Sequence, residues 1–156
     1  MAPDYEPLLE HRIEIAAAPA AVWALVSDLR RMPEWSPQVA STRLRNGAEN
    51  VALGVEFTNL NSQGGIDWIT HGTVVRLESE REIAFRIAEN WVVWSLHLEP
   101  APQGGTTLTQ RRETPDGISE YSLQVTETHL GGQQAFTEVI RAGMRQTLQA
   151  IKAAAE

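Results

Sequence analysis

The chain has 156 residues, of which 42% are hydrophobic and 21% are charged, values typical of one globular domain with a core and room for a pocket. A formal net charge of −7 with a single lysine excludes the basic surface that nucleic acids and anionic membranes require. We therefore expect neither nucleic-acid binding nor membrane insertion. The absence of cysteine excludes disulfide scaffolds, thiolate catalysis and cysteine-type zinc sites.

Domain organisation and location follow from the same data. The length suits a single domain over residues 1–156. The first fifteen residues lack the pattern of a signal peptide, and no apolar run reaches the roughly 20 residues of a membrane helix. We therefore expect a cytoplasmic protein.

The first predicted elements are a strand and two short helices. Ile13 and Ile15 alternate with polar neighbours, as in a half-buried strand, and Pro19 suits the first turn of a helix. Asp28 is placed to cap a second short helix, which Pro33 should end. The apolar residues at helical spacing in this segment are Val22, Leu25, Val26, Leu29 and Met32.

The middle of the chain is predicted to be entirely sheet. Short runs rich in strand-forming residues alternate there with turn signals that contain glycine and asparagine. Strands joined by such tight turns are antiparallel neighbours. We predict strands at residues 39–45, 54–61, 68–78, 82–88, 92–99 and 106–113, which with the first strand makes about seven.

The last quarter of the chain contains the longest helical pattern. Segment 115–130, rich in Gly, Ser and Thr, is predicted to be a loop or loose turn over the mouth of a cavity, with Gly131-Gly132 as a hinge. Apolar residues then recur every three or four positions over about five turns. They are Phe136, Val139, Ile140, Gly143, Met144, Leu148 and Ile151.

Short motifs distributed along the chain carry a family resemblance. They are Trp35-Ser36-Pro37, Trp68, Ile83-Ala84-Phe85-Arg86, Trp94 through Leu98 to Pro100, Gly104-Gly105-Thr106 and Gly143-Met144-Arg145-Gln146-Thr147-Leu148. Over nearly the whole chain, the sequence resembles the polyketide cyclase/dehydrase family of the START-like (SRPBCC, Bet v 1-like) superfamily. The resemblance implies an α+β helix-grip fold: a curved antiparallel sheet wrapped around a long C-terminal helix, with two short helices after strand one and a mostly apolar cavity.

Strand alternation and the helical face predict which side chains would line such a cavity. The inward face mixes large apolar groups with isolated polar ones, a composition typical of a ligand pocket. The tryptophans have a second interpretation, because they can simply fill the space between sheet and helix. The predicted ligand-binding residues are Trp35, Phe57, Asn59, Trp68, Thr70, Trp94, Leu96, Gln110, Arg112, Phe136, Ile140 and Met144.

The orientation of Arg112 has two interpretations. If its side chain faces inward, the guanidinium can hold an enolate or carboxylate oxygen. Alternatively, Arg112 faces solvent, and a one-residue bulge would exchange it with Arg111. The sequence leaves both alternatives open.

The histidines do not suggest a metal site. They are His11, His71, His97 and His129, far apart and never at the i, i+4 spacing of a zinc-binding helix. His71 and His97 alternate with the tryptophans of their strands, which predicts that they face outward. His71 is nevertheless the one candidate general base, and with Arg112 it completes the candidates for catalysis. No nucleotide-binding, phosphate-binding or acyl-enzyme motif occurs, so we predict no cofactor.

Three functions fit these observations. The first is binding of a small hydrophobic molecule, such as a polyketide-like aromatic, a lipid or an isoprenoid. The second is an aromatase/cyclase-dehydrase reaction on a bound poly-ketone chain, which a second titratable group beside Arg112 would favour. The third is a protein-partner module, which a closed cavity or an apolar patch on the outer face would favour. A homodimer is a further open alternative.

Overall fold

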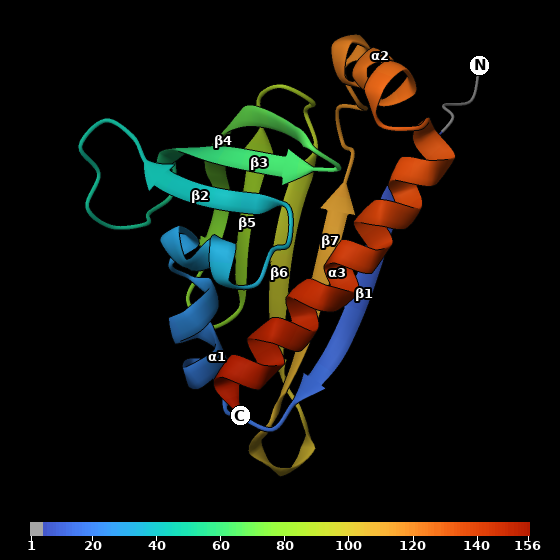
Figure 1. Ribbon diagram of the computed structural model, residues 1–156. Coiled ribbons are helices and arrows are strands. Elements are labelled where there is room, and N and C mark those ends of the chain that lie inside the picture. The colour runs from blue at the N-terminus through green and yellow to red at the C-terminus, as the bar shows by residue number, and fades with distance from the viewer. Residues whose placement is uncertain (1–4) are drawn as a thin grey trace.

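Residues 5–156, which the computed structural model describes, form a curved seven-stranded antiparallel sheet with helices on its concave side (Figure 1). The strands are β1 (Leu8–Ile15), β2 (Val39–Leu44), β3 (Glu56–Gln63), β4 (Ile66–Glu78), β5 (Glu82–Ile87), β6 (Val93–Pro100) and β7 (Thr106–Glu113). The helices are α1 (Pro19–Val26), η1 (Leu29–Glu34), η2 (Pro102–Gly104), α2 (Glu120–His129) and α3 (Gln133–Ala155). The predicted helix-grip fold is confirmed.

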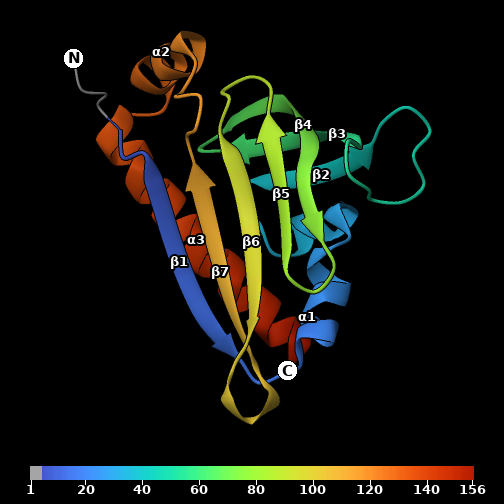
Figure 2. The same ribbon diagram turned by 180° about the vertical axis from the view of Figure 1, so that it is seen from behind.

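The strand order is β1-β7-β6-β5-β4-β3-β2 (Figure 2). Strands β2 to β7 each pair with the next strand in the sequence, whereas β1 pairs with the last strand, β7. Two bulges, between Val39 and Ser41 and between Val74 and Arg76, interrupt the register on the β2–β4 side. Bulges increase local twist and bend a strand, which helps the sheet to curve. Every predicted strand is present, but β3 begins at Glu56 rather than at residue 54, because Gly54 has a φ of 84° and belongs to the preceding turn.

The segment after β1 forms two short helices, as predicted. Pro19 occupies the first turn of α1, where its missing N–H costs no helical hydrogen bond. Asp28 caps η1, because its carboxylate accepts a hydrogen bond of 3.1 Å from the main-chain N–H of Arg30. The prediction that Pro33 ends this helix is wrong, since Pro33 lies inside η1, which continues to Glu34. A proline in so short a 3-10 helix removes a single hydrogen bond.

The helix α3 crosses the concave face of the sheet and ends beside α1 (Figure 1). Its buried residues all lie in its second half, at Met144, Thr147, Leu148 and Ile151. The main core packs around them and comprises Ile15, Val22, Val26, Trp35, Leu98, Leu108, Leu148 and Ile151. A smaller core joins η1 to β3, β4 and β5 through Leu29, Phe57, Val74 and Ile83.

The prediction that segment 115–130 is a loop or loose turn is wrong, because residues 120–129 form α2. The Ser119 hydroxyl caps this helix by accepting a hydrogen bond of 3.2 Å from the Ser122 N–H. Glu120 lies in the first turn of α2, where the helix dipole favours a negative charge. The high content of Ser and Thr hides the helix, because these residues also suit turns. Gly131 and Gly132, with φ of 82° and 94°, then turn the chain into α3.

Candidate functional site

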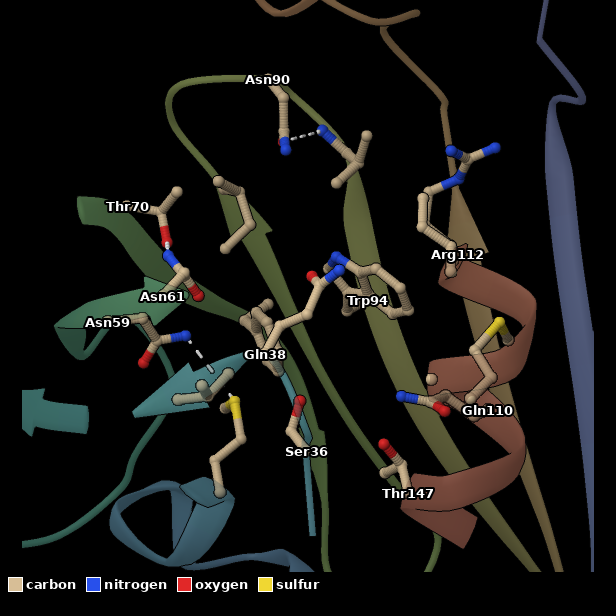
Figure 3. Close-up of a pocket in the computed structure, with 18 of the residues that line it drawn as sticks. Ser36, Gln38, Asn59, Asn61, Thr70, Asn90, Trp94, Gln110, Arg112 and Thr147 are labelled. Atoms are coloured by element: carbon tan, nitrogen blue, oxygen red, sulfur yellow. Dashed lines mark hydrogen bonds between the residues drawn. The ribbon is translucent and has the colours of Figure 1, made fainter. Parts of the chain in front are cut away.

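A cavity of about 180 Å³ lies between the concave face of the sheet and α3. Strands β3 to β7, η1, the turn after it, α2 and α3 all contribute side chains to it. Most of the lining is apolar, and polar side chains gather on opposite sides (Figure 3). The large apolar residues that line the cavity include Leu29, Met32, Trp35, Trp68, Ile83, Phe85, Ile87, Trp94, Leu96, Ile118, Phe136, Val139, Ile140 and Met144.

The first polar group, the amide wall, comprises Asn59 and Asn61 of β3 and Thr70 of β4, which are 4%, 7% and 8% exposed. Asn59 Oδ1 accepts a hydrogen bond of 2.7 Å from Thr42 Oγ1, and Asn59 Nδ2 lies 3.6 Å from Met32 Sδ. Asn61 Nδ2 donates to Thr70 Oγ1 at 2.9 Å. The amide wall is therefore neutral, and protein atoms already engage its amide donors.

The second polar group, the arginine wall, comprises Gln110 and Arg112 of β7 and Gln133 at the start of α3. Arg112 is 4% exposed, and its Nη2 donates to the main-chain oxygen of Glu6 at 2.5 Å. Three buried atoms of this wall have no hydrogen-bond partner in the described chain: Gln110 Oε1, Arg112 Nε and Gln133 Nε2. Buried polar atoms normally have a partner, so the arginine wall is incompletely satisfied by the protein itself.

Among the described residues, the charges beside the arginine wall do not balance. The Glu6 carboxylate forms its ion pair with Arg141, at 2.5 Å, rather than with Arg112. Burial lowers the pKa of Arg112, with a partial offset from Tyr5 and Glu6 and a further decrease from Arg141. Because a guanidinium stays protonated even when its pKa falls, Arg112 places a positive charge at the edge of the cavity that forms no ion pair with residues 5–156.

The sequence left open whether the tryptophans pack in the core or contact a ligand, and the structure places them differently. Trp35 is 7% exposed and belongs to the main core. Trp68 and Trp94 are only partly buried and line the cavity. Trp94 lies between the two polar walls in Figure 3, and in the sheet it is the register partner of Arg112. Its ring therefore presents aromatic surface to the cavity on the strand next to Arg112.

All but one of the predicted ligand-binding residues line the cavity, and their role in binding stays a prediction. Those in place are Trp35, Asn59, Trp68, Thr70, Trp94, Leu96, Gln110, Arg112, Phe136, Ile140 and Met144. The exception is Phe57, which is fully buried in the smaller core, with its ring edge-on to Phe85 at a centroid distance of 5.1 Å. The prediction for Phe57 is wrong because Gly72, its register partner, leaves room for the ring to fold down against β4.

The two candidate catalytic residues lie on opposite faces of the sheet. Arg112 lines the cavity, whereas Arg111 faces away from it and pairs with Glu10 at 2.6 Å, so the alternative with Arg111 inward is wrong. His71 faces away from the cavity, as strand alternation predicts. Its Nδ1 lies 2.5 Å from a carboxylate oxygen of Glu89. The cavity therefore contains one of the two candidates.

Several lining residues were not predicted. Ser122 and Thr126 come from α2, which the sequence did not reveal as a helix. Ser36 and Gln38 lie in the irregular turn after η1, where no periodicity indicates which side chains point inward. Asn61 could have been found, because it lies two positions from a predicted residue on the same face of β3.

Neither a metal cluster nor a membrane helix is found in the described structure. Within residues 5–156, no three His, Asp or Glu side chains are grouped so that they could hold a metal ion. Over the same residues, no helix combines the length and the hydrophobicity that crossing a membrane requires.

Comparisons with known proteins agree with this arrangement. The family model described as polyketide cyclase / dehydrase and lipid transport matches residues 7–156. The chain is similar to the solved structure of a Polyketide_cyc-like protein from Corynebacterium glutamicum, with 27% identity, a TM-score of 0.62, and coverage of 96% of this chain and 91% of that one. No protein with a curated description is similar enough in sequence to count as a match.

Two more distant structures share the fold. The di-domain ARO/CYC StfQ from the steffimycin biosynthetic pathway is 17% identical, with a TM-score of 0.72 over 94% of this chain and 49% of that one. The major latex-like protein 151 from Panax ginseng is 14% identical, with a TM-score of 0.65 over 96% of this chain and 97% of that one. The family match covers nearly all of the described residues. The chain therefore belongs to the family described as polyketide cyclase / dehydrase and lipid transport.

Proposed function

We propose that this protein binds a small, mostly apolar organic molecule in the cavity between the sheet and α3. The observation that supports this most is the unfilled space itself, about 180 Å³ surrounded mainly by aliphatic and aromatic side chains. Protein interiors are otherwise close-packed, and an apolar cavity of about 150 Å³ is enough to bind benzene. Molecules with one or two rings suit this volume, as do parts of polyketide-like aromatics, lipids and isoprenoids.

Affinity would come chiefly from burial of apolar surface. A two-ring molecule that removes about 200 Å² of apolar surface from water gains about 5 kcal/mol, part of which offsets the cost of immobilisation. Trp68, Trp94 and Phe136 offer aromatic surface for the rings. The two polar walls would then orient the polar groups of the molecule.

Aromatase/cyclase chemistry is a second candidate, and the position of Arg112 is the observation that favours it. A buried guanidinium can stabilise an enolate oxygen, but such a reaction also needs a group that accepts and returns protons. Among the described lining residues, the only carboxylate belongs to Asp28, which lies 2.8 Å from Arg30 and is engaged by it. His71 lies outside the cavity. These observations support binding more strongly than catalysis.

A protein-partner role has less support. On the outer face of the described sheet, Leu60 and Ile69 are register partners that are 39% and 56% exposed. Val75, which is 39% exposed, lies near the other end of β4. Small, separated apolar areas of this kind are ordinary on monomeric proteins.

Native mass spectrometry of the protein purified from its own cells tests the proposal directly, because a bound molecule would appear as an added mass. A matched pair of variants tests the cavity. Gly143 of α3 lines it, and a Cβ added there would meet Pro37 Cγ at an ordinary 3.7 Å. Gly143→Ala should therefore bind naphthalene-2-carboxamide about as well as wild type, whereas Gly143→Leu should weaken binding about tenfold by filling the void. Equal binding by both variants would contradict the proposal.

A further inference from the structure

We infer that the ligand is an organic anion whose carboxylate or enolate oxygen lies at the arginine wall and whose neutral part faces the amide wall. The inference rests on the proposed binding function and adds a charge and an orientation to it. It depends on the contrast between a buried guanidinium that forms no ion pair with residues 5–156 and neutral, already engaged amides across an apolar space (Figure 3).

The charges next to the arginine wall support the anion. Arg112, Arg141 and Glu6 supply two positive charges and one negative charge. Glu6 Oε2 lies 2.5 Å from Arg141 Nη2, while within residues 5–156 Arg112 donates only to the main-chain oxygen of Glu6. With Arg112 only 4% exposed, water solvates its charge poorly. A buried charge without a partner is unfavourable, and an anionic ligand would supply that partner.

The unsatisfied hydrogen-bonding atoms support the same position. Arg112 Nε, Gln110 Oε1 and Gln133 Nε2 are buried without partners in the described chain, and all three residues line the cavity. Figure 3 shows the Gln110 side chain pointing from β7 toward the cavity and the Arg112 side chain running upward beside the same strand. An oxyanion can accept a charge-assisted hydrogen bond from the guanidinium. Gln110 Oε1 needs a donor, such as a hydroxyl of the ligand, and Gln133 Nε2 needs an acceptor, such as a carbonyl.

The amide wall does not offer an equivalent site for an anion. Asn61 Nδ2 is engaged by Thr70 Oγ1 at 2.9 Å, and Asn59 Nδ2 lies 3.6 Å from Met32 Sδ. None of these residues carries a charge. The wall therefore suits a neutral or weakly polar part of the ligand, so the two walls together set which end of the molecule enters which side.

Long-range electrostatics would not produce this preference. The chain carries a formal charge of −7, so its overall field repels anions. A preference for an anion must then come from the local guanidinium. Arg111 provides the matched control, since it is the adjacent residue with the same charge but faces away from the cavity and pairs with Glu10.

The test compares naphthalene-2-carboxylate with naphthalene-2-carboxamide, which share size and shape and differ in charge. Isothermal titration calorimetry would measure both with wild type, Arg112→Met and Arg111→Met. We expect wild type to bind the carboxylate about tenfold or more tightly than the carboxamide. Arg112→Met should abolish this ratio by weakening carboxylate binding, and Arg111→Met should preserve it.

The outcomes distinguish a failure of this inference from a failure of the proposed binding function. Binding of the carboxamide at least as tight as that of the carboxylate by wild type would overturn the anion but support the cavity. A carboxylate preference that persists in Arg112→Met, or disappears in Arg111→Met, would also overturn the assignment. Failure of both compounds to bind would overturn the proposed function and this inference with it. If Arg112→Met does not fold, the wild-type ratio and the Arg112→Lys variant, which keeps the charge, still decide the question.

Discussion

The two halves of α3 follow the same apolar periodicity but meet different surroundings. In the second half, Leu148 and Ile151 are completely buried against β1, α1, β6 and β7. In the first half, Phe136 and Ile140 are only partly buried and line the cavity. A regular helix therefore produces both a packed core and an open pocket, and the residues opposite the helix decide which.

The difference lies in the size and chemistry of the facing side chains. Opposite the second half, Ile15, Val22, Leu98 and Leu108 supply branched aliphatic volume. Opposite the cavity, the sheet carries polar side chains, such as Asn61 and Thr70 in the amide wall, together with the aromatic rings of Trp68 and Trp94. These side chains do not interdigitate with the first half of α3 as the aliphatic residues of the core do with the second half, so a void of about 180 Å³ remains.

Shortening a side chain in each half should produce the largest contrast. Leu148→Ala should lower the free energy of unfolding by about 2–5 kcal/mol, because it creates a cavity in a packed core. Ile140→Ala should cost only about 1 kcal/mol, because that side chain already borders a void and has fewer contacts to lose. Urea denaturation measures both, with the exposed Gln149→Ala as a control. Equal losses for the first two would show that the first half of α3 is packed as tightly as the second.

A steric substitution would separate the smaller core from the cavity. Gly72→Ala places a Cβ 2.7 Å from Phe57 Cε1, so the Phe57 ring must shift, and we expect a loss of about 1–3 kcal/mol in the free energy of unfolding. Adding Phe57→Leu should recover part of that loss. Ligand affinity should stay near the wild-type value, because Phe57 does not line the cavity. A large loss of affinity in a variant that remains folded would contradict the separation of the two regions.

A smaller and more local effect is expected at α2, whose residues close one side of the cavity. The Ser119 hydroxyl accepts from the Ser122 N–H and donates to the Glu89 main-chain oxygen at 2.7 Å. Ser119→Ala should therefore cost about 1 kcal/mol, seen as faster amide hydrogen exchange within α2. Thr128→Ala, at an exposed position of the same helix, should leave exchange unchanged. Unchanged exchange in Ser119→Ala would show that contacts other than the cap hold α2.

The sequence predicted the sheet and most of the cavity, because both follow from regular periodicity. Strand alternation predicted that Asn59, Gln110 and Arg112 lie on the inward faces of their strands. It could not decide whether Arg112 or Arg111 faces inward, because a one-residue bulge would exchange them. It could not identify α2, which is held by a cap and tertiary contacts rather than by an apolar stripe. It also misplaced Phe57. Strand alternation predicts which face of the sheet a side chain lies on, but it does not predict that the Phe57 ring packs down over Gly72 instead of reaching the cavity.

The smallest predicted effect concerns Asp28, which caps η1 at the side of the cavity. The hydrogen bond from the Arg30 guanidinium holds the pKa of Asp28 below its ordinary value, with burial opposing. The folded state therefore binds fewer protons than the unfolded state, and the stabilisation is complete above about pH 5 and falls as the pH decreases through the folded pKa. Asp28→Asn keeps a capping oxygen but loses the charge. In urea denaturation, wild type should lose more stability than Asp28→Asn between pH 5 and pH 3, by less than about 1 kcal/mol, because Asp28 is 33% exposed and solvent screens the pair. Parallel losses in the two proteins would show that the side-chain oxygen, and not its charge, stabilises η1.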